Sequence, residues 1–190
     1  MADKTRIKIA LPTLVFFCAI LFFDVSILPF IPFFAAILHE AGHIAVMKIC
    51  KVKIKEIKIL PFGIDIKKEN KITSYKTDIA VSSAGIAVNI LLLLLCTLLP
   101  KTPETILFAS SNVLLIFINI LPINSLDGGQ MLEKLLEYKY DPQIANKVTA
   151  TTSLVCITLL GSVAIWVLFK TSYNFSLLLM CIYLFCGIIF

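Results

Sequence analysis

Long uncharged blocks, separated by short charged segments, dominate this chain. Four blocks contain no Asp, Glu, Lys or Arg, and each is long enough to cross about 30 Å of hydrocarbon as a helix. They are Ile79–Leu99, Thr105–Leu126, Val148–Phe169 and Thr171–Phe190. Two further candidates precede them, the short block Ile9–Phe23 and the block Val25–Met47, which carries polar residues. The pattern predicts an all-α polytopic membrane protein with about six transmembrane helices, folded as a single domain over residues 1–190.

A different pattern occupies the charged segment after the second predicted helix. Apolar residues alternate with charged ones from Val52 to Ile59, with a one-residue slip at Lys55 and Glu56. Pro61, Phe62 and Gly63 then predict a turn before a second short strand. We therefore expect a short membrane-associated β-hairpin with one apolar face.

The amino-acid composition excludes several other classes of protein. Hydrophobic residues make up 59% of the chain and charged residues 15%, against about 25% charged residues in an ordinary soluble domain. A soluble domain of this length could not bury so much apolar surface. An intrinsically disordered chain, a secreted disulfide scaffold and a nucleic-acid-binding globule are therefore excluded.

The basic residues are unevenly distributed, and their placement predicts the topology. Of 17 Lys and Arg, three precede Ile9, nine lie in Lys48–Lys76 and three in Lys134–Lys147, whereas only Lys101 and Lys170 lie in the other connections. Placing the rich segments on one side gives 15 basic residues against 2, a positive-inside asymmetry. We expect the N-terminus, the hairpin and the C-terminus in the cytoplasm. The net charge of +5 is interpreted as a topology signal and headgroup attraction, not as nucleic-acid binding.

The candidate chemistry begins with the sequence HEAGH, from His39 to His43, near the cytoplasmic end of the second predicted helix. Residues four apart share a helix face, so both imidazoles can reach one metal ion, and Glu40 can act as a general base toward a water. The alternative is a pair of core histidines that bind each other. The metal interpretation is favoured because the chain has only these two histidines and because ionisable groups in a membrane helix are costly.

A catalytic zinc usually takes a third protein ligand, and Asp127 is the best candidate for it. It follows the uncharged run Thr105–Leu126 directly. The alternative is an ordinary N-cap that starts the amphipathic helix Gln130–Tyr140. Asp24 and Asp78 fit the role of ligand less well, because the first is expected on the outer side and the second at the membrane entry of the third span.

Two features beside Asp127 favour an unusual backbone there. Pro122 should break or kink the helix in the run before it and expose main chain at the membrane boundary. Gly128 and Gly129 follow Asp127 and allow a close approach or an unusual turn.

Four segments together carry a resemblance to a known family. The motif His39–His43, the segment Ser83–Asn89 (SAGIAVN) and the segment Asn119–Gly129 (NILPINSLDGG) resemble, in this order, the motifs of the site-2 protease family of intramembrane zinc metalloproteases. Leu60–Gly63 (LPFG) is similar to the loop after the zinc helix in the small sporulation-type branch of that family, which has no accessory domain. The match covers roughly Leu38–Met131. Asn124 departs from it, because many relatives carry proline there.

The resemblance implies what the site does. One Zn²⁺ per chain would be bound by His39, His43 and Asp127, with Glu40 as catalytic acid and base. The implied reaction is hydrolysis of a peptide bond in or near a transmembrane segment of a membrane-tethered protein, a regulator or transcription-factor precursor, in a prokaryotic cell membrane. The expected partners are this substrate, the lipid bilayer and a membrane-protein regulator, with no nucleic acid. Because the chain ends at Phe190, no nucleotide-sensing or peptide-binding domain is expected.

Several residues receive supporting roles. Gly85 is expected to let helices pack closely, and Asn89 to make a hydrogen bond between helices. By resemblance, Asn119 either binds the scissile backbone or holds Asp127 in place.

The hairpin itself is expected to take part in binding the substrate. Its outer edge at Ile54 and Ile57 is predicted to pair with an unwound substrate segment as an added strand. The alternative is a hairpin that only anchors the chain to lipid.

Two other functions stay open at this point. A catalytically silent member of the family would bind membrane clients without cutting them, and the presence of Glu40 argues against this. A transporter that uses the same ionisable groups would be expected to show internal repeats, which the sequence does not display.

Overall fold

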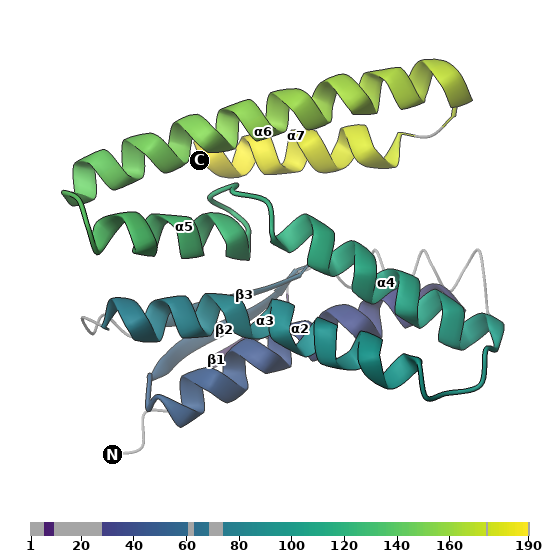
Figure 1. Cartoon of the computed structure of the whole chain (residues 1–190), viewed down its shortest axis with the longest axis horizontal. Coiled ribbons are helices and arrows are strands. Elements are labelled where there is room, and N and C mark those ends of the chain that lie inside the picture. Colours follow the sequence, from purple (N-terminus) through teal and green to yellow (C-terminus); the bar gives the residue numbers. More distant parts are fainter. Residues whose placement is uncertain (1–5, 10–27, 61–62, 69–73, 174, 190) are drawn as a thin grey trace. The chain divides into compact units, whose positions relative to one another are not determined.

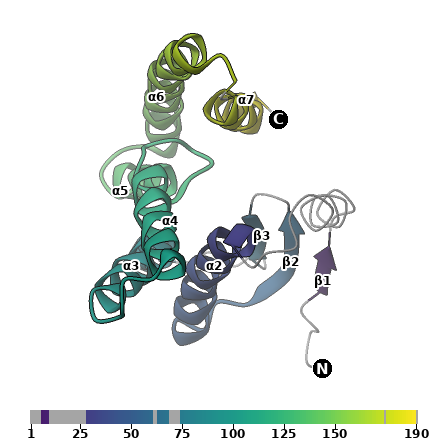
Figure 2. The same ribbon diagram turned by 90° about the vertical axis from the view of Figure 1, so that its right-hand side faces the viewer.

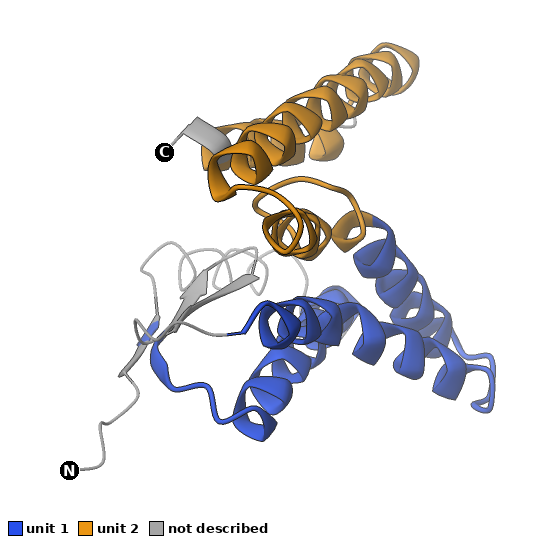
Figure 3. Cartoon of the chain, turned by 60° about the vertical axis from the view of Figure 1, so that its left-hand side comes forward, with its two compact units in different colours: residues 1–117 blue, residues 118–190 orange. Residues whose placement is uncertain are grey.

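The computed structural model describes residues 6–9, 28–60, 63–68, 74–173 and 175–189. The chain divides into two compact units, residues Met1–Phe117 and Ile118–Phe190, which Figure 3 colours separately. The single domain expected from the sequence stays a prediction.

Helices make up most of the described chain (Figure 1). Unit 1 contains β1 (Arg6–Ile9), the 3-10 turn η1 (Leu28–Phe30), α2 (Ile31–Ile49), β2 (Ile54–Leu60), β3 (Gly63–Lys68), α3 (Tyr75–Cys96) and most of α4 (Pro103–Asn119). Unit 2 contains α5 (Asp127–Glu137), α6 (Pro142–Thr171) and α7 (Ser176–Ile189).

Three of these helices are long and apolar enough to cross a membrane. They are Leu28–Ile49, Tyr75–Cys96 and Pro142–Thr171, and the shorter apolar helices are Pro103–Asn119 and Ser176–Gly187. The expectation of about six transmembrane helices is thus confirmed for three among the described residues. Most of the first expected span, Ile9–Phe23, lies outside the described residues, and Ile9 itself ends β1.

The expected span Thr105–Leu126 is shorter than the sequence suggested. Its helix, α4, ends at Asn119, three residues before Pro122. Proline disfavours helical geometry in the residue before it and offers no N–H for a helical hydrogen bond, so the apolar run continues as non-helical chain. The predicted break at Pro122 is confirmed.

A tight cap ends α2 and leads directly into the hairpin. The N–H of Val52 donates to the carbonyl of Met47 at 2.8 Å, and the N–H of Lys51 donates to that of Lys48 at 3.1 Å. Lys51 has φ 56°, the left-handed conformation that this Schellman cap requires. The chain therefore reverses within three residues of α2, and the strand that follows stays beside the helix that carries the histidines.

The predicted hairpin is confirmed, including its slip. β2 pairs antiparallel with β3, and the register shifts between Ile54 and Glu56, where the alternation of the sequence also slips. β3 contacts α2, as Figure 2 shows from the side. The amphipathic segment after Asp127 also forms the expected helix, α5.

The third strand of the sheet was not expected. β1 pairs parallel with β2, with Arg6 opposite Glu56 and Ile9 opposite Ile59, so the strand order is β1-β2-β3. At Ile57, β2 has a neighbour on both sides, Ile7 on β1 and Ile66 on β3. The open edge predicted at Ile57 is therefore wrong, and a role of Ile54 in binding substrate stays a prediction.

The pairing of β1 with β2 agrees with the predicted topology. A parallel pair needs a long crossover connection, here the segment that includes α2. Arg6–Ile9 and Glu56–Ile59 share one sheet, as expected if the N-terminus and the hairpin lie on the same side of the membrane.

Small residues allow α2 and α3 to cross closely in unit 1. A Cβ added at Gly42 would lie 2.7 Å from Val88 Cγ2 and 3.0 Å from the carbonyl oxygen of Ala84. Both distances are shorter than ordinary contacts, so a larger residue at this point of α2 would force Val88 or the main chain of α3 to shift. The close crossing brings the side chains of α3 onto the histidine face of α2.

Unit 2 is organised around α6. This helix packs along α7 and against α5 (Figure 1). A small apolar core joins Ile123 of the α4–α5 connection to Ile157 of α6 and Leu184 of α7. The connection before Asp127 is therefore anchored on α6.

Candidate metal centre

The two histidines of α2 turn toward each other in the interior of unit 1. His39 and His43 are 4% and 7% exposed, and their Nε2 atoms are 3.3 Å apart. Their rings are nearly perpendicular, with an interplanar angle of 78°. The expected common helix face is confirmed, and both histidines present the same ring nitrogen to one point.

The partner of His43 fixes its tautomer. Nδ1 of His43 is 2.7 Å from the main-chain carbonyl oxygen of Val81 on α3. A carbonyl can only accept, so Nδ1 carries the proton and donates it. In the neutral ring Nε2 then holds a lone pair, the form in which histidine binds a metal.

The partner of His39 is Asn89, also on α3. The Asn89 side chain is fully buried, and its Nδ2 is 2.9 Å from Nδ1 of His39. This contact confirms the predicted hydrogen bond between helices. Its partner on α2 is His39, a candidate metal ligand. With Nδ2 toward His39, the Asn89 Oδ1 atom has no hydrogen-bond partner among the described residues.

The Asn89 carboxamide can form a hydrogen bond with Nδ1 of His39 whether or not that nitrogen carries a proton. With Nδ2 toward the ring, Asn89 donates to Nδ1, and the Nε2–H of His39 can donate to Nε2 of His43. When Nε2 of His39 binds a metal, Nδ1 carries the proton and needs an acceptor, which Oδ1 provides after a rotation of the amide by 180°. The same contact can therefore orient His39 with and without a metal.

Gly85 of α3 packs directly against the two Nε2 atoms. A Cβ added there would lie 2.5 Å from Cε1 and Nε2 of His39 and 2.5 Å from Nε2 of His43. Ordinary contacts begin at 3.4 Å, so any larger residue would occupy the space that both nitrogens face. The close packing expected at Gly85 thus occurs against the histidine pair.

The histidine pair fits a zinc ion by a simple distance test. Two nitrogens at about 2.0–2.1 Å from a tetrahedral zinc are about 3.3–3.4 Å apart. The measured separation of the Nε2 atoms is 3.3 Å. This separation fits two ligands of one metal, and it also fits the hydrogen bond between the two rings in the metal-free protein.

Glu40 lies between the histidines in the sequence, on α2, and its side chain is half-buried. Glu40 lies two residues before Gly42, the point at which α3 crosses α2. A carboxylate on this helix, one residue from a ligand, is suited to receive and donate a proton at the same centre.

Asp127 belongs to unit 2 and is 9% exposed. It is the first residue of α5, and Leu126 is the N-cap. Asp127 is thus in the first turn and is not the cap that the alternative interpretation proposed. His39, His43 and Asp127 are the three candidate metal ligands, and the role of Asp127 as the third ligand stays a prediction.

The two glycines after Asp127 fold the start of α5 tightly against the chain before it. A Cβ at Gly128 would lie 2.4 Å from the carbonyl oxygen of Ile120, and one at Gly129 would lie 2.0 Å from that of Ile123. The close approach predicted for Gly128 is confirmed. Asn119 is the last residue of α4 and half-buried, and its proposed role stays a prediction.

The main-chain carbonyl of Val81 was not predicted as part of this centre. A carbonyl carries no signal in the sequence, because every residue has one. Its position follows from the crossing of α2 and α3.

Comparisons with known proteins agree with this chemistry. The sequence profile of Peptidase family M50 matches residues 101–160, which include Asp127. Stage IV sporulation protein FB from Bacillus subtilis (strain 168) is 33% identical over 146 residues, 74% of this chain. The chain belongs to peptidase family M50, the site-2 protease family. The resemblance to the site-2 protease family found in the sequence is therefore confirmed.

The fold agrees with membership of family M50. The solved structure of the site-2 protease from Methanocaldococcus jannaschii superimposes with a TM-score of 0.69 and 25% sequence identity, over 96% of this chain and 88% of that one. The chain spans about half the length of the sporulation protein, since the alignment covers 50% of it. Family M50 membership makes the chain a membrane metalloprotease homologue with a candidate metal site.

Proposed function

We propose that this protein is an intramembrane zinc endopeptidase that cuts a membrane-tethered protein in or near its transmembrane segment. The observation that carries the proposal is the histidine pair, whose two Nε2 atoms lie 3.3 Å apart and pack against Gly85. His39, His43 and Asp127 would hold one zinc. The supporting contacts of Val81 and Asn89 keep both rings in the orientation that binding needs.

The residues of the chain then have separate tasks. A bound zinc would polarise the scissile carbonyl and lower the pKa of water. Glu40 takes a proton from the attacking water and returns it to the leaving amine. His39 precedes the end of α2 by ten residues and His43 by six, so they lie about 15 Å and 9 Å along the helix from its cytoplasmic end. In this proposal water reaches the zinc from the cytoplasmic end.

A substrate helix hides its peptide bonds in its own hydrogen bonds, so the segment to be cut must first unwind. An unwound segment in or near lipid leaves main-chain groups unpaired, which is costly. An edge strand can satisfy them. Because β2 is the central strand, we place the added strand on β3, the edge strand that contacts α2.

The experiment that tests the activity compares point variants of the full chain in membranes with a co-expressed candidate client. Glu40→Gln should retain zinc and client binding while cleavage falls by at least about 100-fold. His39→Ala, His43→Ala and Asp127→Ala should each lose zinc. Undiminished cleavage by Glu40→Gln would refute the proposed mechanism, and full zinc content in Asp127→Ala would refute the third ligand.

The mode of binding has its own test. Photocrosslinkers placed at Ile64 or Ile66 of β3 should capture the client. A crosslinker at Ile7 of β1, on the opposite edge of the sheet, is the matched control and should not. Capture from β1 alone would place the client on the other edge.

A further inference from the structure

The chain between α4 and α5 is held by one buried serine of α6. Ser153 is fully buried, and its Oγ atom accepts a hydrogen bond of 2.9 Å from the main-chain N–H of Asn124. Its own proton has a good acceptor in the carbonyl of Thr149, at 2.7 Å, with the carbonyl of Pro122 at 3.4 Å and Asn124 Oδ1 at 3.3 Å. The hydroxyl thus joins α6 to the segment that precedes Asp127.

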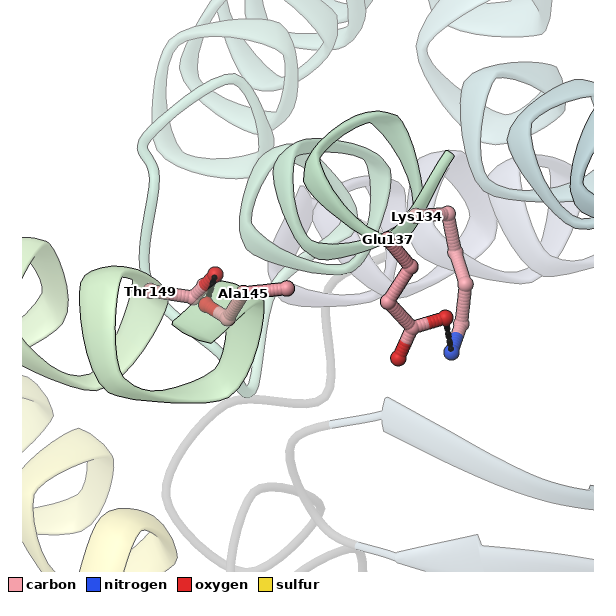
Figure 4. Close-up of polar contacts among 4 residues, drawn as sticks. All are labelled: Lys134, Glu137, Ala145 and Thr149. Atoms are coloured by element: carbon pink, nitrogen blue, oxygen red, sulfur yellow. Dashed lines mark hydrogen bonds and ion pairs between the residues drawn. The ribbon is translucent and has the colours of Figure 1, made fainter. Parts of the chain in front are cut away.

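No neighbouring hydroxyl on this face of α6 does the same. Thr149, one turn earlier, is also fully buried, but it donates to the carbonyl of Ala145 in its own helix, as Figure 4 shows. The Lys134–Glu137 ion pair in the same view lies within α5, 2.8 Å long, and does not reach the connection. Among the described contacts, the polar link from α6 to the connection is therefore Ser153.

The bond to Asn124 lies at a turn that sets the start of α5. The N–H of Leu126 donates to the carbonyl of Ile123 at 2.8 Å, so Asn124 is the second residue of a four-residue turn. Leu126 is the N-cap of α5, and Asp127 follows it. A fixed Asn124 N–H therefore fixes the direction in which the first turn of α5 begins, three residues later.

Apolar packing alone does not set this direction. Ile123 packs against Ile157, one helical turn after Ser153 on α6. Such contacts are not directional and resist sliding only weakly. A hydrogen bond constrains both distance and angle, so the serine adds the orientation that the apolar contact lacks.

We infer that Ser153 is a positioning residue, which orients the Asp127 carboxylate for metal binding through the N–H of Asn124. The inference rests on the proposed function in one respect, that Asp127 is a ligand. Ser153 is itself neither a metal ligand nor a substrate contact. It acts only through the turn.

The central test uses the full chain in detergent and removes the acceptor. Ser153→Ala leaves a buried N–H without a partner while the apolar packing of Ile123 remains. Hydrogen exchange of the peptide covering residues 119–127 should speed up by about tenfold or more, and zinc should be lost to a competing chelator about tenfold more readily. Ser162→Ala is the matched control, because Ser162 is an exposed residue of α6 that donates only to the carbonyl of Leu159.

A second substitution separates the N–H from a general loss of structure. Proline has no N–H and is favoured at the second position of such a turn. In the background of Asn124→Pro, Ser153→Ala should therefore weaken zinc retention by less than about threefold. In the background of Asn124→Ala, which keeps the N–H, the full loss should return.

Unchanged exchange over residues 119–127 in Ser153→Ala would overturn the inference, as would an equal zinc loss in the proline background. If Asn124→Pro fails to fold, the exchange measurement decides alone. The outcomes separate this inference from the proposed function. Full zinc content in Asp127→Ala would remove the third ligand, whereas accelerated exchange in Ser153→Ala would still establish the link from α6 to the turn.

Discussion

Gly85→Ala should prevent zinc binding although it replaces none of the proposed ligands. The added Cβ would lie 2.5 Å from three atoms of the two imidazole rings, where ordinary contact begins at 3.4 Å. The rings or α3 must therefore move by about 1 Å. Zinc ligands keep their distances within about 0.2 Å, so the required displacement is about five times that tolerance. We expect zinc retention to fall at least about 100-fold.

The same methyl group also overpacks the crossing of the helices. Overpacking costs about 1–3 kcal/mol of stability, so a loss of zinc must be separated from a loss of fold. Gly42→Ala is the matched control, because the three atoms nearest to its added Cβ belong to Val88 and Ala84 at the same crossing. Gly161→Ala, with nothing within 4 Å of the added Cβ, controls for the substitution itself.

The assay measures zinc per chain by elemental analysis after dialysis against a chelator of graded strength, with thermal unfolding in the same detergent. Gly85→Ala should lose zinc while Gly161→Ala keeps it. Gly42→Ala should unfold earlier, yet retain more zinc than Gly85→Ala. Wild-type zinc retention in Gly85→Ala would refute the interpretation that both Nε2 atoms bind one metal beside Gly85.

Three further predictions concern other parts of the chain. Asn89→Leu should weaken zinc binding by about 10–100-fold because Nδ1 of His39 loses its acceptor, whereas Asn89→Asp should retain it; equal losses in chelator competition would contradict this role. Lys51→Gly should raise the free energy of unfolding by about 0.5–1 kcal/mol in a denaturation series, because glycine adopts the φ of 56° without strain, and a lower value would contradict it. A cysteine label near Lys67 should react only from the cytoplasm and one near Thr102 only from outside, and the reverse pattern would invert the topology.

The local features of this protein were accessible from its sequence. The lengths of the apolar blocks predicted the three helices that are long enough to cross a membrane, and the spacing of four residues placed His39 and His43 on one face. The alternation of apolar and charged residues predicted the hairpin down to its register shift at Ile54 and Glu56. Pro122 predicted where the helix would break. Each of these follows from the geometry of a single element, so nearby residues suffice to determine it.

The partners that make these elements into a site depend on the tertiary structure. β1 covers the edge of β2 from some fifty residues away, and no pattern within β2 indicates a parallel neighbour. Val81 and Asn89 reach the histidines only because Gly42 and Gly85 allow α2 and α3 to cross closely. Ser153 looks in the sequence like any other hydroxyl of an apolar helix, and packing alone brings it to the N–H of Asn124. A residue type determines what a side chain can bond, but the approach of distant elements decides which bond is made.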